Sequence, residues 1–102
     1  MYKNGRGVPK DDKEAVRWHR LAAKQGHAMA QYNLGGAYNT GRGVPEDTVV
    51  AYMWANLAGA NGYDATELKE DLESKMSPEN ISEAQKLIRQ MMKDFPDIYL
   101  QI

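Results

Sequence analysis

Small and hydrophobic residues recur at steps of three and four positions in two parts of the chain. Between Asp11 and Gln25 they are Ala15, Trp18, Leu21 and Ala22, and between Asp47 and Asn61 they are Ala51, Trp54, Leu57 and Ala58. This spacing places the side chains on one stripe of an α-helix. The pattern therefore predicts two helices with equivalent buried faces, and it assigns both tryptophans to the core as packing groups.

The two helices belong to an internal repeat. The pentapeptide Gly-Arg-Gly-Val-Pro begins at Gly5 and again at Gly41, which gives a period of 36 residues. Such a period is typical of stacked helical hairpins, in which each unit buries its apolar face against a neighbour. We interpret the pentapeptide as a hairpin turn, because glycine permits positive φ and proline fixes the approach to the next helix. A phosphate-binding loop is the alternative, but this segment does not follow a strand.

Another helix is predicted from His27 to Asn39. Its inner face consists of Ala30, Leu34, Ala37 and Tyr38. Gly35 and Gly36 interrupt it, and a glycine inside a helix costs about 1 kcal/mol relative to alanine. We expect this pair to permit close packing against the ring of Trp18 or Trp54.

The helix ends carry recognisable signals. Asp11 is a candidate N-cap, and Glu14 three residues later completes a capping box that would satisfy two backbone donors. In the second copy Val50 replaces that glutamate, so we expect a weaker cap at Asp47. Gly26 fits the left-handed position that follows a helix.

After Gly62 the period drifts, and the third unit is degenerate. Its first apolar stripe consists of Leu68, Leu72 and Met76. Ser77 and Pro78 then mark the start of a strongly amphipathic helix that runs to about Lys93. We interpret this element as a capping helix that shields the last apolar surface of a solenoid. The apolar residues 95–102 either fold back on this cap or bind a partner.

Composition and charge are those of an ordinary globular domain. Charged residues make up 26% of the chain, the net charge is −1, and cysteine is absent, so disulfides and thiolate chemistry are excluded. Residues 1–25 carry seven basic and three acidic side chains, while the remainder carries six basic and eleven acidic ones. A basic end can attract nucleic acid, but acids are mixed in and no aromatic interleaving suggests base stacking. We therefore interpret it as a solvated helix face.

No apolar run is long enough to span a bilayer, so we expect a soluble chain without a membrane span. The sequence does not distinguish a cytoplasmic location from a periplasmic one, the second requiring a signal segment that has been removed.

Candidate chemistry is sparse. The chain contains no phosphate-loop, zinc-protease or nucleophile-elbow motif. His19 and His27 lack the i, i+4 spacing of a helical metal pair, and we interpret them as surface histidines. An acidic group offers carboxylates for a cation, but without regular ligand spacing we interpret it as a solvated face; it consists of Glu67, Glu70, Asp71 and Glu73. We expect no enzymatic activity, no cofactor and no metal site.

Together these motifs resemble the Sel-one-like repeat family, a relative of the tetratricopeptide repeats. The resemblance is carried by Ala30-Gln31-Tyr32-Asn33-Leu34-Gly35 with Tyr38, by the turn at 41–47, and by Ala51-Tyr52-Met53-Trp54 with Leu57-Ala58 and Gly62. Met76-Ser77-Pro78-Glu79 with Ala84-Gln85 also resembles the helix after the last repeat in many bacterial members. The likeness covers nearly the whole chain.

The resemblance implies an all-α fold, a right-handed superhelix of helical hairpin repeats with a C-terminal capping helix. We expect one domain over 1–102. Its parts are a partial repeat at 1–26, a complete repeat at 27–62, a degenerate repeat with the capping helix at 63–94, and a tail at 95–102. Since the first repeat lacks the counterpart of its first helix, we expect an open N-terminal unit that associates with a second copy or another chain.

Family members act as adaptors, so the resemblance implies a non-catalytic module that binds a protein or peptide on its concave face or through its open end. In tetratricopeptide-like arrays the first helix of each hairpin lines the concave side. Transferring that geometry by register gives the candidate partner-binding residues Lys3, Asn4, Met29, Tyr32, Gly36 and Asn39. Tyr32 is the best anchor because an exposed tyrosine offers a large contact area. In the alternative interpretation, Tyr32 is not a binding residue and packs against a neighbouring helix of its own chain.

An envelope-associated hydrolase is the alternative function that the resemblance implies. It requires a nucleophile beside a base. The available groups are Ser74, Ser77 and Ser82, with His19 and His27 distant in sequence. We expect no nucleic-acid partner.

Overall fold

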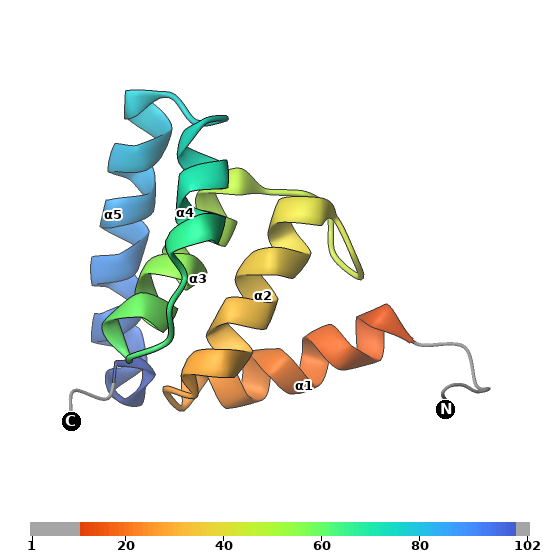
Figure 1. Ribbon diagram of the computed structural model, residues 1–102. Coiled ribbons are helices and arrows are strands. Elements are labelled where there is room, and N and C mark those ends of the chain that lie inside the picture. Colours follow the sequence, from red (N-terminus) through yellow and green to blue (C-terminus); the bar gives the residue numbers. More distant parts are fainter. Residues whose placement is uncertain (1–10, 100–102) are drawn as a thin grey trace.

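The computed structural model describes residues 11–99 as a row of helices (Figure 1). The elements are α1 (Asp12–Lys24), α2 (Ala28–Thr40), α3 (Thr48–Ala60), α4 (Thr66–Glu73), α5 (Pro78–Asp94) and the 3-10 turn η1 (Pro96–Ile98). Helix α2 packs between α1 and α3, and α5 lies along α3. The predicted all-α solenoid with a final capping helix is therefore confirmed. Between residues 11 and 99, no helix combines the length and apolar character needed to cross a membrane.

The aspartates before α1 and α3 cap these helices as predicted, but both make the same single hydrogen bond, so the weaker cap predicted at Asp47 is not seen. Asp11 accepts a hydrogen bond from the backbone N–H of Glu14 at 3.2 Å, and Asp47 caps α3 in the same way at 3.1 Å. The capping box at α1 is only half formed, because the Glu14 carboxylate turns to the helix surface. There it accepts from the Trp18 indole at 3.3 Å and pairs with Arg17 at 3.3 Å.

The turn after α2 adopts the geometry that its glycines predict. Gly41 ends the helix with φ 78°, and its N–H donates to the Ala37 carbonyl at 2.7 Å. Gly43 follows with φ 81°. A Cβ on Gly43 would lie 2.5 Å from the carbonyl oxygen of Asp12, so the turn also lies directly against the first turn of α1. The pentapeptide thus joins successive repeats as well as reversing the chain.

The core is built around α3. Trp54 and Leu57 are 3% and 2% exposed, and they share one cluster with Ala30 and Leu34 of α2. A second cluster joins the alanine face of α3 to Leu68 and neighbouring residues of α4 and α5. The core assignment of Trp54 is confirmed. Those of Trp18 and Leu21 are wrong, because these residues are 62% and 52% exposed.

The two glycines of α2 have different surroundings, and neither lies against a tryptophan ring as predicted. A Cβ on Gly35 would meet the Ala51 carbonyl oxygen and the Leu68 side chain, each at 3.2 Å. A Cβ on Gly36 would meet nothing within 4 Å. Gly35 therefore permits close contact between the α2 and α3 backbones, whereas Gly36 lies on an open face.

Residues 95–99 fold back on the helices, which is the first of the two predicted alternatives for the tail, whereas residues 100–102 lie outside the described part of the chain. Ser77 caps α5 through a reciprocal capping box with Asn80, and Phe95 ends that helix. Ile98 of η1 is fully buried, in the same cluster as Trp54. The capping helix and its tail thus close one end of the core.

A hydrogen bond from the Tyr52 hydroxyl to the Glu73 carboxylate ties α3 to α4. The pKa of Tyr52 is raised above its ordinary value of 10.0. Burial is the largest cause, followed by the hydrogen bond to Glu73 and the negative charge of the Glu73 carboxylate. The folded state therefore holds the phenolic proton more tightly, so this stabilisation is full below pH 10.0 and is lost as the pH rises through the folded pKa. We expect Tyr52→Phe to cost about 1 kcal/mol at neutral pH and to lose stability less steeply than wild type above pH 10. Urea unfolding at several pH values tests this, and equal slopes would contradict it.

Candidate functional site

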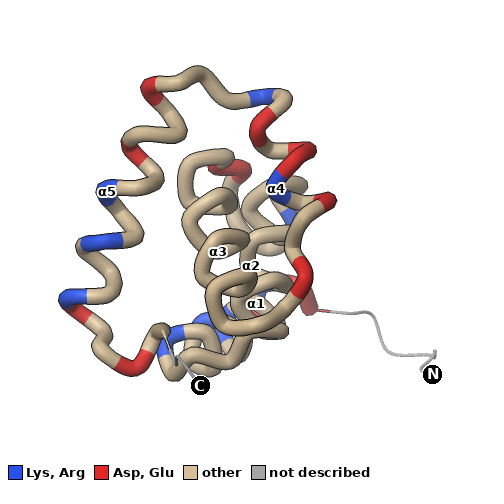
Figure 2. Tube along the Cα trace, turned by 60° about the vertical axis from the view of Figure 1, so that its left-hand side comes forward, with Lys and Arg blue, Asp and Glu red and all other residues tan. Residues whose placement is uncertain are grey.

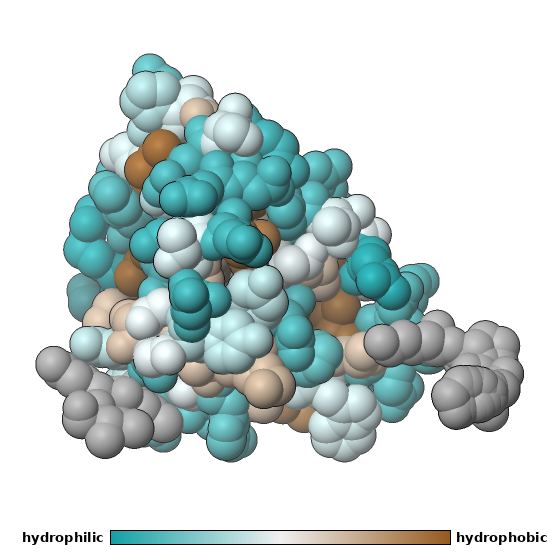
Figure 3. Space-filling model, in the orientation of Figure 1, coloured by the Kyte–Doolittle hydropathy of each residue, from teal (hydrophilic) through white to brown (hydrophobic). Residues whose placement is uncertain are grey.

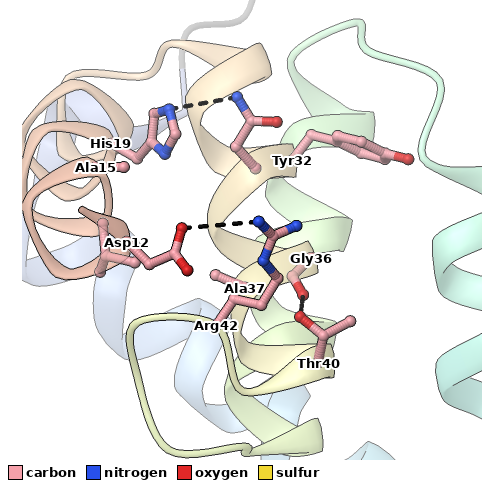
Figure 4. Close-up of a pocket in the computed structure, with 10 residues that line it drawn as sticks. Asp12, Ala15, His19, Tyr32, Gly36, Ala37, Thr40 and Arg42 are labelled. Atoms are coloured by element: carbon pink, nitrogen blue, oxygen red, sulfur yellow. Dashed lines mark hydrogen bonds and ion pairs between the residues drawn. The ribbon is translucent and has the colours of Figure 1, made fainter. Parts of the chain in front are cut away.

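A groove opens between α1, α2 and the turn that follows α2 (Figure 4). Its volume is about 530 Å³. The lining residues are Asp12, Ala15, Val16, His19, Tyr32, Asn33, Gly36, Ala37, Thr40 and Arg42. In the space-filling view, brown and tan apolar atoms lie between the teal surfaces where α1 approaches this turn (Figure 3). The groove is thus an open surface feature with an apolar strip.

Small residues form the floor of the groove. Ala15 comes from α1, and Gly36 and Ala37 come from α2. Because a Cβ on Gly36 would touch nothing within 4 Å, the backbone of α2 is accessible here. Small side chains let another backbone approach closely, as Gly35 does where α2 packs on α3. The floor is therefore suited to a close-packed helix.

Polar groups border this floor and hold one another in place. The Arg42 guanidinium lies 3.7 Å from the Asp12 carboxylate, and the Asn33 amide lies 3.5 Å from Nε2 of His19 (Figure 4). The Thr40 hydroxyl donates to the Gly36 carbonyl at 3.0 Å. These contacts are exposed, so each contributes little to stability. They leave polar groups at the edge of the groove that a partner can contact.

Beside the groove, α1 exposes two large apolar side chains. Trp18 is 62% exposed and Leu21 is 52% exposed. Their counterparts 36 residues later, Trp54 and Leu57, are 3% and 2% exposed. Residue type and position in the repeat are the same, so the difference lies in what covers each helix. In the second unit α2 packs on α3, whereas the described residues provide no equivalent cover for α1.

The repeat register shows what shape fits this surface. Gly35 of α2 packs against Ala51 and Ala55 of α3. A Cβ added to Gly35 would lie 3.2 Å from the Ala51 carbonyl oxygen and 3.4 Å from the Ala55 nitrogen. Their counterparts 36 residues earlier are Ala15 and His19, which line the groove. The groove and the Trp18–Leu21 surface together form what we call the open face. It corresponds to the face of α3 that α2 covers.

The predicted partner-binding residues are dispersed in the structure. Gly36 and Tyr32 line the groove, but the Tyr32 ring points away from α1 and packs on Tyr63, with ring centroids 4.8 Å apart. Met29 is 61% exposed, outside the groove lining. Asn39 donates to Asp71 at 2.9 Å and accepts from Lys75 at 2.6 Å, which links α2 to α4 and to the segment just after α4. Lys3 and Asn4 lie outside the described residues.

Comparison with known proteins identifies the repeat. The family model for the Sel1 repeat matches residues 1–27 and 28–63. The chain belongs to the Sel1 repeat family. The Sel1 repeat is a helical repeat that serves protein–protein interaction. Among curated proteins, no sequence matches the chain.

A solved structure shares the fold of this Sel1 repeat chain. It is the crystal structure of c5321, a protective antigen present in uropathogenic Escherichia coli strains displaying an SLR fold. The two are 34% identical with a TM-score of 0.81 over 94% of this chain. The match spans 21% of the length of that protein, so the chain corresponds to about one fifth of it.

Sequence reasoning missed most of the open face of this Sel1 repeat chain. The sequence predicts a surface position for His19, which agrees with its place in the open groove, and a core position for Trp18, which is wrong. The available signal was the repeat register, since the counterparts of Ala15 and His19 receive the preceding helix. The sequence indicates this exposure only indirectly: without a counterpart of the first helix of its repeat, the tryptophan stripe of residues 11–25 is expected to be partly uncovered, and Trp18 is 62% exposed.

Proposed function

We propose that this Sel1 repeat chain is a non-catalytic adaptor module whose open face binds an α-helix of a partner protein. The observation that carries the proposal is the exposure of Trp18 at 62% against 3% for its counterpart Trp54. A tryptophan beside a leucine on an open surface is the kind of anchor that dominates binding energy in protein interfaces.

A helix is favoured as the bound element because a helix covers the equivalent face in the next unit. There Leu34 of α2 shares a cluster with Trp54 and Leu57, while Gly35 lets the two backbones approach. A partner helix with an aliphatic residue beside a glycine or alanine would make the same contacts with Trp18 and Ala15. Binding of this kind is the helix-in-groove mode of recognition.

The chemistry of the described residues supports a binding role over the hydrolase alternative. The hydroxyl of Ser77 accepts from the Asn80 backbone, and that of Ser74 donates to the Asp71 carbonyl at 2.6 Å. His19 contacts Asn33 across the groove. Two of the three candidate nucleophiles are therefore engaged at helix ends, and the groove holds a histidine without a serine in its lining.

Charge supports a protein partner over a nucleic acid. The first half of α5 carries acidic residues and its second half mostly basic ones, and acidic residues predominate on α4 (Figure 2). On α1, Arg17 is paired with Glu14 and Arg20 donates to the Tyr38 hydroxyl at 2.9 Å. The basic residues of α1 are mixed with Asp12 and Glu14, and the whole chain has a net charge of −1, whereas a domain that binds nucleic acid is typically strongly basic.

A synthetic peptide with the sequence of residues 27–41 tests the open face directly, because α2 is the helix that covers the equivalent face. We expect it to bind the full chain one to one and to shift tryptophan emission to shorter wavelength as Trp18 becomes covered. Trp18→Ala should weaken binding at least about tenfold, as loss of an anchor does. Gly36→Trp should do the same by filling the floor.

Met92→Ala provides the matched control, since Met92 is an exposed apolar residue on α5 and lies away from the groove lining. It should leave peptide affinity unchanged. Equal affinity of wild type, Trp18→Ala and Gly36→Trp would reject the open face as the binding site. Concentration-dependent dimerisation that Trp18→Ala abolishes would instead identify a second copy as the occupant.

A further inference from the structure

Two side-chain amides grip one backbone carbonyl near the end of the chain. Nε2 of Gln31 donates to the Ile98 carbonyl at 2.7 Å, and Nδ2 of Asn61 donates to the same oxygen at 3.0 Å. Gln31 is fully buried. Its Nε2 also donates a second hydrogen bond, to the Ala23 carbonyl at 2.9 Å. Its Oε1 accepts from Asn61 at 2.9 Å. We call Gln31 and Asn61 the carbonyl clamp.

The clamp is built by the body of the fold, and its occupant comes from elsewhere. Ala23 lies in the last turn of α1, Gln31 at the start of α2, and Asn61 caps the end of α3. Ile98 arrives from 67 residues after Gln31. The turn η1 contacts both α5 and α1. Three helix ends therefore form a receptor, and residues 95–99 fill it.

The occupying segment docks as a short peptide would. The Ile98 side chain is fully buried in a cluster with Val16, Ala23 and Leu57, whereas Pro96 and Asp97 are exposed. Phe95 is half-buried, with the Lys24 ammonium 4.8 Å from its ring centroid. Contact thus requires one carbonyl, one aliphatic side chain and one aromatic side chain. This combination uses backbone recognition for affinity and side-chain pockets for selection.

We propose that the carbonyl clamp is a peptide-binding site, distinct from the open face, that binds residues 95–99 of a second copy when its own segment is displaced. A second copy offers the same contacts, so exchange creates no new mismatch. The hinge is short, because Phe95 is the single residue between α5 and η1. The tethered segment has an effective concentration on the order of millimolar, so its own copy occupies the clamp until it is displaced.

The full chain carrying Ile98→Asp, titrated with the peptide of residues 95–102, tests the site. Burial of a charge should expel the variant's own segment. We expect the peptide to bind one to one and to raise the melting temperature of the variant. The same peptide with aspartate at the Ile98 position should not bind, and adding Gln31→Ala to the receptor should weaken binding at least tenfold. Wild type should bind at least tenfold more weakly than Ile98→Asp, because its clamp is occupied.

Circular dichroism is used to check that Ile98→Asp keeps its helices. If it does not, the titration uses Ile98→Ala, which retains the backbone but empties the aliphatic pocket, and its melting temperature should rise with peptide. Met92→Ala added to the receptor is the control and should leave peptide affinity unchanged. No binding to a folded Ile98 variant would overturn the proposal.

A mixture of two full-length variants tests exchange between copies. Ile98→Asp has an intact clamp without a segment that fits, and Gln31→Ala has the segment with a weakened clamp. We expect native mass spectrometry to show a one-to-one heterodimer on mixing, with each variant monomeric alone. Monomers only, at concentrations where the free peptide binds, would limit the site to its own chain and refute exchange with a second copy.

Discussion

Trp54→Ala is expected to lower the free energy of unfolding by about 3–5 kcal/mol, because it removes a buried indole and leaves a cavity. Trp54 is 3% exposed at the centre of a cluster formed by α1, α2, α3, α5 and η1. Few neighbours can move into the space, since the same cluster contains the buried Leu34 and Ile98. Urea unfolding followed by helical circular dichroism measures the loss.

Trp18→Ala is the matched control that the repeat itself provides. The residue is the same and lies 36 positions earlier, but it is 62% exposed. We expect its replacement to cost less than about 1 kcal/mol, mainly through the hydrogen bond to Glu14 at 3.3 Å. Equal losses at the two positions would mean that Trp18 is covered in solution, and dilution experiments would then show whether another copy covers it.

This pair illustrates how far the sequence predicts the fold. Periodicity and turn chemistry depend on local preferences, and they correctly predicted the helices, the aspartate caps and the turn at Gly41. The two tryptophans have the same local pattern, so the sequence assigned both to the core. Burial is a property of the neighbours, and only Trp54 has a helix packed over it.

The carbonyl clamp shows a second limit of sequence reasoning. Gln31 follows Ala30 inside an apolar helix, and nothing in its local pattern distinguishes a buried amide from a surface one. Its role depends on Asn61 and Ile98, which lie 30 and 67 residues away. The tail was predicted either to fold back or to bind a partner, and its apolar composition was the only available signal. Contacts at such separation are fixed by tertiary packing.

Gly43→Ala is expected to lower the free energy of unfolding by about 2–5 kcal/mol. A left-handed backbone costs a residue with a Cβ about 1–2 kcal/mol. Overpacking adds about 1–3 kcal/mol, because the new Cβ would lie 2.5 Å from the Asp12 carbonyl oxygen and 3.0 Å from the Val16 side chain. Relief requires moving the turn away from α1, since the closest atom belongs to the backbone.

Gly41→Ala separates these two costs. Gly41 also has positive φ, at 78°, but a Cβ there would meet its nearest neighbours at 3.7 Å. It should therefore lose only the conformational cost of about 1–2 kcal/mol. Denaturant unfolding compares the variants, and equal losses would show that Gly43 does not touch α1 in solution.

Because Arg42 lies between these glycines and lines the groove, Gly43→Ala should also weaken binding of the 27–41 peptide, whereas Gly41→Ala should weaken it less. The second glycine of the pentapeptide would then serve the contact between repeats, and the first would serve the turn alone.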